Sequence, residues 1–205
     1  WRIRTVNRDN KLIEIHELWS PVRAMTLLVK LHLPLRTYQV RFLDSGEADT
    51  WRYEKGEWVL NQRHPFKNGS EKNPWNRGVF CRIRSPDIGE IMTGLYINTN
   101  KTADQNKDER ERGYTIPWQH AEVLHWLRKL RNWQERYNPI TAPVPWTALQ
   151  TKHFGRTPPH SDVLAQLGSA CFLFRDPTDG GGDRPLVDIT LTALWYKLLE
   201  RLEKR

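Results

Sequence analysis

The spacing of apolar residues changes from helical to alternating and back to helical along the chain, and this order limits its fold most strongly. Helical spacing runs over residues 21–33, 118–137 and 189–205. Between the first two of these, three segments are rich in β-branched and aromatic residues, as strands are: 78–83, 91–99 and 114–116. The order predicts an α+β protein, dominated by helices, with a small antiparallel sheet of three strands.

The length of 205 residues, with 38% hydrophobic residues, suits one domain with a real core. Residues 1–20 alternate apolar and charged side chains and are interpreted as an entry arm or linker, so the domain is expected over 21–205. No run approaches the roughly 18 apolar residues of a membrane span, so no membrane partner is expected. The sequence starts at Trp1 and stops at Arg205 inside a helical pattern, which suggests a piece of a longer protein.

The net charge indicates which class of partner the chain binds, and the cysteine content indicates the redox state of its compartment. The chain has 32 Lys and Arg against 24 Asp and Glu, a net charge of +8, which favours an anionic partner such as nucleic acid. Cys81 and Cys171 are too few for a four-ligand zinc site or a disulfide scaffold, and they fit a reducing cytoplasm. The ten tryptophans are scattered, which is typical of core or half-buried anchors.

Several enzyme classes lack their motifs here. The Gly180–Gly182 run has no Gly-Lys-Ser/Thr, so it is not a phosphate loop, and no G-x-S-x-G elbow is present. The seven histidines are dispersed, and no cofactor or metal is expected. Pro86-Asp87 followed by Glu90 keeps a magnesium-dependent nuclease as an alternative, although Met92 stands where such a site needs lysine.

Two segments carry residues suited to phosphate chemistry. In Leu33–Asp44, which reads LPLRTYQVRFLD, Arg36 opens an expected second helix over Leu35–Asp44, where the positive end of the dipole favours an anion. In the second segment, GLYINTNKT, a strand delivers Lys101 to the tip of a hairpin, and a polar insert then leads to a returning strand. Each residue taken alone is ordinarily a solvated surface cation.

In this order the two segments resemble the catalytic domain of the tyrosine recombinases, the phage-integrase family. That family has an arginine at the start of a helix that ends in Leu and Asp, then a three-stranded sheet with a lysine between its second and third strands, then a helix. Here Arg36, Leu43-Asp44, Lys101 and the helix after Pro117 follow in sequence, with a separation of 65 positions from Arg36 to Lys101. The resemblance covers about residues 21–137 and implies a tyrosine-recombinase-like fold.

The resemblance implies metal-free strand exchange on double-stranded DNA, with a homo-oligomer assembled on the DNA of a mobile element. A tyrosine attacks the scissile phosphate, and the phosphotyrosine link conserves the bond energy. Arginines grip the non-bridging oxygens, and a lysine protonates the departing 5′ oxygen. By resemblance, Arg36 is the first arginine and Lys101 the general acid. Gln39 stands where the family often carries an acidic residue.

The family also needs a later His-x-x-Arg and a tyrosine. His125 and Arg128 match too early in the chain, whereas His153 and Arg156, with Tyr196 after them, are followed by helix-breaking prolines. The favoured expectation places the second arginine and the nucleophile beyond Arg205, which makes this chain alone inactive. Residues 138–205 are then interpreted as an insertion of a subgroup. A non-catalytic nucleic-acid-binding module and a tryptophan-rich protein-interaction domain remain as alternatives.

Overall fold

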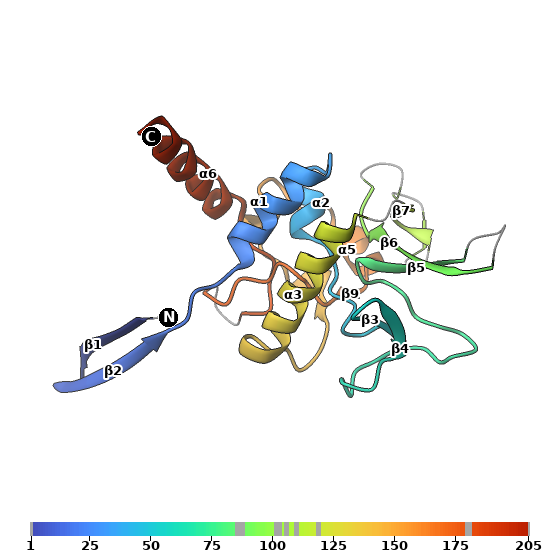
Figure 1. Cartoon of the computed structure of the whole chain (residues 1–205), viewed down its shortest axis with the longest axis horizontal. Helices are drawn as coiled ribbons and strands as arrows, with labels where there is room; N and C mark the ends of the chain where they lie inside the picture. The colour runs from blue at the N-terminus through green and yellow to red at the C-terminus, as the bar shows by residue number, and fades with distance from the viewer. Residues whose placement is uncertain are drawn as a thin grey trace.

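The computed structural model describes residues 2–84, 89–100, 104, 107–108, 111–117, 120–178 and 182–204, in a mixed arrangement of helices and small antiparallel sheets (Figure 1). This is compatible with the α+β prediction. The elements in chain order are β1 (Arg2–Arg8), β2 (Lys11–Glu17), α1 (Val22–His32), α2 (Thr37–Arg41), β3 (Trp51–Glu54), β4 (Glu57–Leu60), β5 (Phe80–Arg84), β6 (Ile91–Ile97), β7 (Tyr114–Ile116), α3 (Ala121–Tyr137), β8 (Val144–Pro145), a 3-10 turn (Trp146–Ala148), α4 (Thr151–Phe154), α5 (Ser161–Gln166), β9 (Ser169–Ala170) and α6 (Asp188–Glu203).

The core forms where α1 and α3 pack together beside the sheet β5–β6–β7. Helix α3 begins after His120, whose ring Nδ1 accepts a hydrogen bond from the Val123 amide at 3.3 Å. Its apolar stripe is buried as its spacing predicts, and it includes Val123, Leu127 and Leu130. The helix predicted over 118–137 is therefore confirmed from Ala121 onward.

The predicted antiparallel sheet of three strands is confirmed, with β6 between β5 and β7. Gly94 lies at the centre of β6, facing Cys81 of β5. A Cβ atom at Gly94 would come within 2.4 Å of the Ile83 Cδ1 atom and 2.6 Å of the Ile116 carbonyl oxygen. Only glycine therefore allows the chain to pass this close to its neighbours in the central strand.

Helix α2 is shorter than the predicted Leu35–Asp44, because the residues after it pair with a distant segment. The Leu173 amide donates to the Leu43 carbonyl oxygen at 2.9 Å, and Asp44 forms an antiparallel bridge with Phe172. A further helical turn would withdraw Leu43 and Asp44 from this pairing. The long-range contacts therefore end the helix at Arg41.

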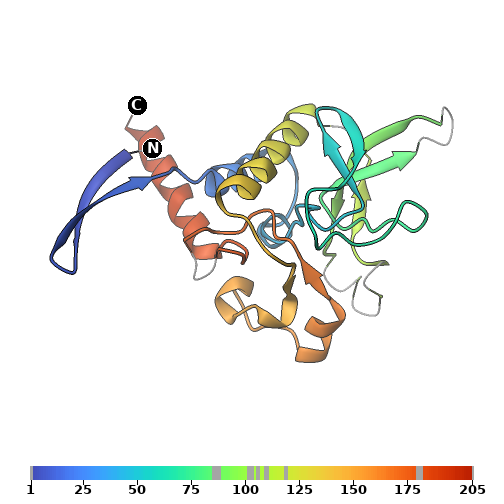
Figure 2. The same cartoon turned by 90° about the horizontal axis from the view of Figure 1, so that it is seen from below.

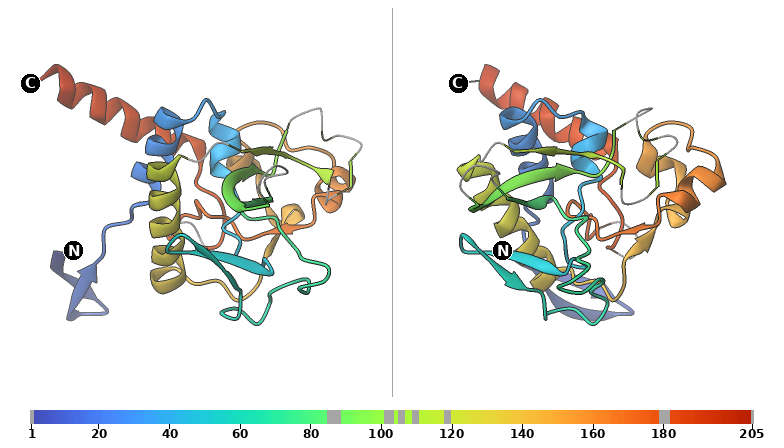
Figure 3. Two further views of the ribbon diagram at one scale, coloured as in Figure 1. Left: turned by 45° about the vertical axis from the view of Figure 1, so that its right-hand side comes forward. Right: turned by 90° about the vertical axis from the view of Figure 1, so that its right-hand side faces the viewer.

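The first 20 residues, predicted as an arm or linker, contain the two-stranded hairpin β1–β2. Its strands pair in register around the turn Asp9-Asn10, where both residues have positive φ angles of 52° and 60°. Such a two-residue turn matches the twist of a hairpin and explains why alternating residues form strands here. In Figure 3 the hairpin projects away from the rest of the chain.

Residues 138–205 contribute to the same core as the residues before them. Leu173, Phe174, Leu186 and Leu191 are buried in the cluster that holds α1 and α3. Figure 2 shows α4 and α5 together at one edge of the molecule, while α6 extends outward. The Gln166 Oε1 atom of α5 accepts a hydrogen bond from the Arg112 Nη2 atom at 3.4 Å, which places α5 beside the chain that leads into β7. The segment is packed into the body rather than attached to it, and its origin as a subgroup insertion stays a prediction.

The tryptophans and cysteines lie as expected for packing residues. Trp146 is buried, and most of the other described tryptophans are half-buried, whereas Trp19 and Trp195 are exposed. Cys171 is buried and Cys81 half-buried, and neither forms a disulfide. Among the described helices, none is long and apolar enough to cross a bilayer.

The largest shifts in carboxyl pKa values belong to Asp44, Asp49 and Glu135. Burial raises the pKa of Asp44 to about 6, and burial together with the neighbouring Asp44 raises the pKa of Asp49 to about 7. Burial also disfavours ionisation of Glu135, but hydrogen bonds from His64 and Arg52 outweigh it and lower the pKa of Glu135 to about 2. The two aspartates, with raised pKa values, and Glu135, with a lowered one, therefore change the free energy of unfolding in different pH ranges.

We expect the free energy of unfolding to fall by on the order of several kcal/mol as pH rises from about 4 to about 8, because the pKa values of Asp44 and Asp49 are raised in the folded protein. In that window the Asp44 and Asp49 carboxyl groups ionise freely in the unfolded state, whereas burial keeps them protonated in the native state. Rising pH therefore stabilises the unfolded state relative to the native state, until the native carboxyl groups ionise as well. Glu135 has the opposite effect, because its pKa is lowered in the folded protein. Its contribution to the free energy of unfolding is present above about pH 4.5 and is lost as pH falls toward 2. Urea unfolding across this range tests the prediction.

Asp49→Asn is the control variant for this pH dependence. Both Asp49 carboxylate oxygens accept backbone hydrogen bonds, from the Arg77 amide at 2.7 Å and the Gly78 amide at 2.9 Å, so the amide side chain lowers stability at every pH. Because Asn does not titrate, the decline of stability with pH should be shallower in the variant. An unfolding free energy that rises steadily to pH 8 in the unaltered chain contradicts the prediction.

Candidate functional site

The start of α2 is joined to the end of the central strand by one buried side chain, that of Gln39. Its Oε1 atom accepts from the Arg36 amide at 3.1 Å, and its Nε2 atom donates to the Thr99 carbonyl oxygen at 3.1 Å and to the Tyr114 hydroxyl at 3.2 Å. Gln39 is 6% exposed. Three chain segments therefore meet at this residue, and two of them are the segments that the sequence singled out.

Arg36 occupies the position immediately before α2, as expected, and it is exposed to solvent. The buried neighbours Leu33 and Leu35 anchor the segment that leads to it. The next residue, Thr37, accepts a hydrogen bond through its Oγ1 atom from the Lys30 Nζ atom at 2.6 Å. This places a second cation beside the residue that follows Arg36.

Lys101 lies outside the described residues, but the chain leading to it is described. After β6, the Asn98 side-chain Nδ2 atom donates to the Phe42 carbonyl oxygen at 2.7 Å, which ties the strand end to the residue after α2. The Asp104 Oδ2 atom accepts from the Asn100 amide at 2.5 Å and from the Gly113 amide at 3.1 Å. The backbone positions that precede and follow the polar insert are thus held by one buried carboxylate.

A cavity of about 570 Å³ lies beside the Gln39 junction and contains a second exposed arginine. Thr99 and Asn100 line it from the strand end, and Arg156 lines it with its guanidinium carbon 5.6 Å from the centre of the Tyr38 ring. Burial raises the pKa of Tyr38 to about 12, against the opposing charge of Arg156. Tyr38 therefore acts here as a neutral aromatic platform.

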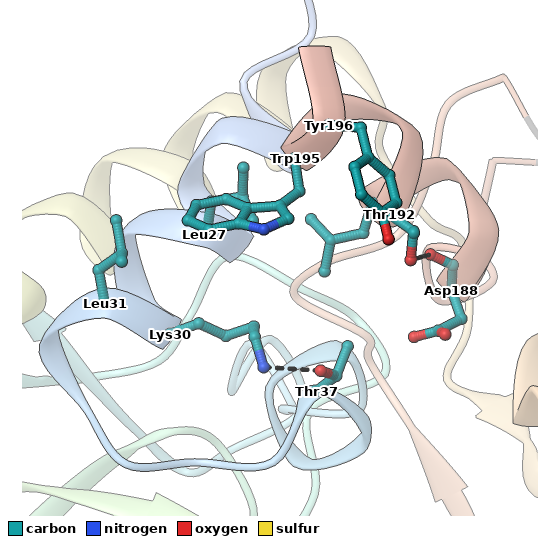
Figure 4. A pocket seen from close by; sticks show the side chains of 9 residues that line it. Leu27, Lys30, Leu31, Thr37, Asp188, Thr192, Trp195 and Tyr196 are labelled. Atoms are coloured by element: carbon teal, nitrogen blue, oxygen red, sulfur yellow. Dashed lines mark hydrogen bonds between the residues drawn. The ribbon is translucent and has the colours of Figure 1, made fainter. Parts of the chain in front are cut away.

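A separate cavity of about 330 Å³ lies between α1, the start of α2 and α6 (Figure 4). Lys30, Thr37 and Asp188 provide its polar wall, and the rings of Trp195 and Tyr196 border it from α6. Sequence reasoning missed Lys30, because a cation near the end of an amphipathic helix is ordinarily a solvated residue. The only sequence signal is its place seven residues before Thr37.

The His153, Arg156 and Tyr196 side chains are in three different settings. The His153 ring is fully buried, and its Nδ1 atom accepts from the Gln150 amide at 2.9 Å. Arg156 lines the cavity beside Tyr38, whereas Tyr196, which is 66% exposed, lines the cavity beside α1. These two cavities are therefore each lined by one member of the trio.

Within the described part of the chain, one group of side chains has metal-like spacing: Glu47, His64 and Glu135, whose ligand atoms lie within 4.8 Å of one another. Both carboxylates are already paired with arginines, Glu47 with Arg175 and Glu135 with Arg52. A cation placed there would meet those positive charges, so the group fits an ion-pair network rather than a metal site. Asp87, which raised the nuclease alternative, lies outside the described residues.

Comparison with known proteins identifies a family for this chain. Residues 1–147 match the model of a protein family described as "Putative integrase". The chain belongs to this integrase family. No curated protein and no solved structure matches the chain. The family assignment agrees with the resemblance that the sequence showed.

The family match gives this integrase an integrase-like function with DNA as its partner. The matched residues include Arg36, Gln39, the sheet β5–β6–β7 and Lys101, and they end before His153, Arg156 and Tyr196. The Gln39 junction therefore lies wholly within the part of the chain that defines the family. The junction is also the place where the structure joins the two predicted site segments.

Proposed function

We propose that this integrase breaks and rejoins strands of double-stranded DNA through a phosphotyrosine intermediate. In this proposal residues 21–205 belong to a helix-dominated, tyrosine-recombinase-like catalytic domain that works as an oligomer on DNA. The observation that carries the proposal is the Gln39 side chain, which holds the backbone of Arg36 against the end of the strand that precedes Lys101. An arginine and a lysine so connected can act on one phosphate.

Arg36 is proposed to bind the non-bridging oxygens of the scissile phosphate. A guanidinium presents parallel N–H donors, which match two phosphate oxygens and stabilise the charge that develops as phosphorus becomes five-coordinate. Its exposed position before α2 leaves the guanidinium accessible to DNA. The buried hydrogen bonds of Gln39 hold the backbone from which this side chain extends.

Lys101 is proposed as the general acid of the cleavage step. The attacking tyrosine hydroxyl loses its proton to solvent as its oxygen forms a bond to phosphorus. The bond between phosphorus and the 5′ oxygen breaks, and a proton of the Lys101 ammonium passes to that oxygen. The reverse transfer rejoins the strand without another energy source. The nucleophilic tyrosine and the second arginine are not assigned to residues of this chain.

Lys101→Ala in the full-length protein should slow strand cleavage by about 10²–10⁴-fold, the usual contribution of a general acid. A DNA substrate with sulfur in place of the bridging 5′ oxygen should restore most of that rate, because a thiolate leaves without protonation. Formation of the covalent protein–DNA adduct, resolved on a denaturing gel, measures both rates. Lys107→Ala, in the same polar insert, is the matched control and should cleave both substrates at the normal rate.

Failure of sulfur rescue removes Lys101 from the general-acid role. A full-length protein that binds DNA but never forms an adduct contradicts the catalytic proposal as a whole, and it favours the non-catalytic nucleic-acid-binding module. Cleavage that requires magnesium and stops with a chelator contradicts it in favour of the nuclease.

A further inference from the structure

The hairpin β1–β2 stands apart from the body of the integrase, joined to it through the segment that leads into α1 (Figure 1). Nearly all of its side chains are exposed, and only Val6, Ile15 and Glu17 are half-buried. Seven residues in each strand give it a length of about 20 Å. The family match starts at residue 1, so the hairpin is part of what defines the family.

The strand register sorts the charges of the hairpin onto its two faces. Side chains of paired residues lie on the same face, and successive pairs alternate between faces. One face carries the pairs Arg2 with Glu17, Arg4 with Ile15, Val6 with Ile13, and Arg8 with Lys11. The opposite face carries the pairs Ile3 with His16, Thr5 with Glu14, and Asn7 with Leu12. All four strand cations therefore lie on one face, with a single carboxylate.

The two ends of this basic face differ in their charge pairing. At the end nearest the body, the Glu17 Oε2 atom accepts from the Arg2 Nε atom at 2.6 Å, and the Glu17 Oε1 atom forms an ion pair with the Arg4 Nε atom at 2.6 Å. At the tip, Arg8 and Lys11 face each other across the strands and form no ion pair with another described residue. Two like charges directly opposite each other destabilise a strand pair unless an anion lies between or above them.

We propose that this basic face of β1–β2 is a second DNA contact, separate from the Gln39 junction. A two-stranded ribbon fits the major groove, which is about 12 Å wide, and the Arg8–Lys11 tip would then reach backbone phosphates. DNA supplies the repeated anions that the unpaired tip cations need, which an ordinary apolar protein surface does not. The proposal rests on the proposed function, because it takes double-stranded DNA as the substrate.

The test measures how DNA affinity depends on salt. Each phosphate contact contributes about 0.9 to the slope of log K against log salt concentration, so Arg8→Ala/Lys11→Ala should reduce the slope by about 2. Arg201→Ala/Lys204→Ala, which removes the same two kinds of charge from the exposed end of α6, should leave the slope unchanged. Glu17→Gln releases Arg2 and Arg4 from their carboxylate and should increase both affinity and slope.

The outcomes separate this proposal from the proposed function. If the unaltered protein shows no salt-sensitive DNA binding, the proposed function itself fails. If the unaltered protein binds and the tip variant keeps the full slope, or if both double variants lose the same amount, the hairpin contact is wrong. Loss of self-association by the tip variant, with DNA binding intact, would instead assign the face to protein contact and overturn the proposal.

Discussion

Arg36→Ala is expected to slow DNA strand cleavage by the full-length integrase by about 10²–10³-fold, while DNA affinity changes little. That is the usual effect of removing one donor that stabilises the transition-state anion, and it corresponds to about 2.7–4 kcal/mol. The effect falls on the rate because the developing charge on phosphorus needs the guanidinium more than the ground-state phosphate does. Arg36 is one of many cations that can contribute to binding alone.

Single-turnover adduct formation and a DNA-binding titration measure the two effects separately. Arg136→Ala, an exposed arginine near the end of α3, is the matched control and should preserve both. Gln39→Ala should reduce the cleavage rate without removing a charge, because it releases the Arg36 amide and the Thr99 carbonyl oxygen. An Arg36→Ala protein that cleaves at the normal rate removes Arg36 from the site.

Glu47→Ala is expected to lower the free energy of unfolding by about 3–5 kcal/mol, the usual result of removing one partner of a buried ion pair. Glu47 and Arg175 are both fully buried, and their side chains make two hydrogen bonds, at 2.6 and 3.2 Å. The Ser45 hydroxyl also donates to Glu47, at 2.6 Å. Without the carboxylate, the Arg175 guanidinium stays inside the protein with an uncompensated charge.

Chemical denaturation of the two variants and the unaltered chain tests this expectation. Glu47→Ala/Arg175→Met should lose less stability than Glu47→Ala alone, because it removes the stranded charge together with its partner. Glu200→Ala, which breaks the exposed pair with Lys204, should change stability by less than about 1 kcal/mol. A Glu47→Ala effect as small as that of Glu200→Ala contradicts the assignment of a buried pair.

The sequence predicted the elements that are specified by short-range patterns of apolar and β-branched residues. The stripe of α3 and the short returning strand β7 (Tyr114–Ile116) lie within the predicted segments, since apolar periodicity and β-branched runs act over a few residues. The shortening of α2 could not be predicted, because it depends on Phe172 and Leu173, about 130 residues later. The hairpin within the arm over residues 1–20 was not predicted, because its turn, Asp9-Asn10, lacks the usual glycine.

The candidate site was predictable only in part, for the same reason. The place of Arg36 before a helix follows from the Leu33–Asp44 pattern, and the structure agrees. The role of Gln39 as a junction did not follow, because its partners Thr99 and Tyr114 are brought to it by the sheet. The role of Lys101 stays a prediction. The burial of Arg41 and Arg175 did not follow either, since no local pattern shows that an arginine will be buried with distant acceptors.

The pairing of the residues after α2 with Phe172 and Leu173 affects when this region can fold during synthesis. At the end of α2, Arg41 donates to the carbonyl oxygens of His153 and Leu186, and the next residues pair with Phe172 and Leu173. A chain emerging from the ribosome exposes the Arg36 motif well before it reaches those partners. About 130 further residues must therefore be synthesised before the segment after α2 can pair, and until then the chain carries Arg36 on an incomplete support.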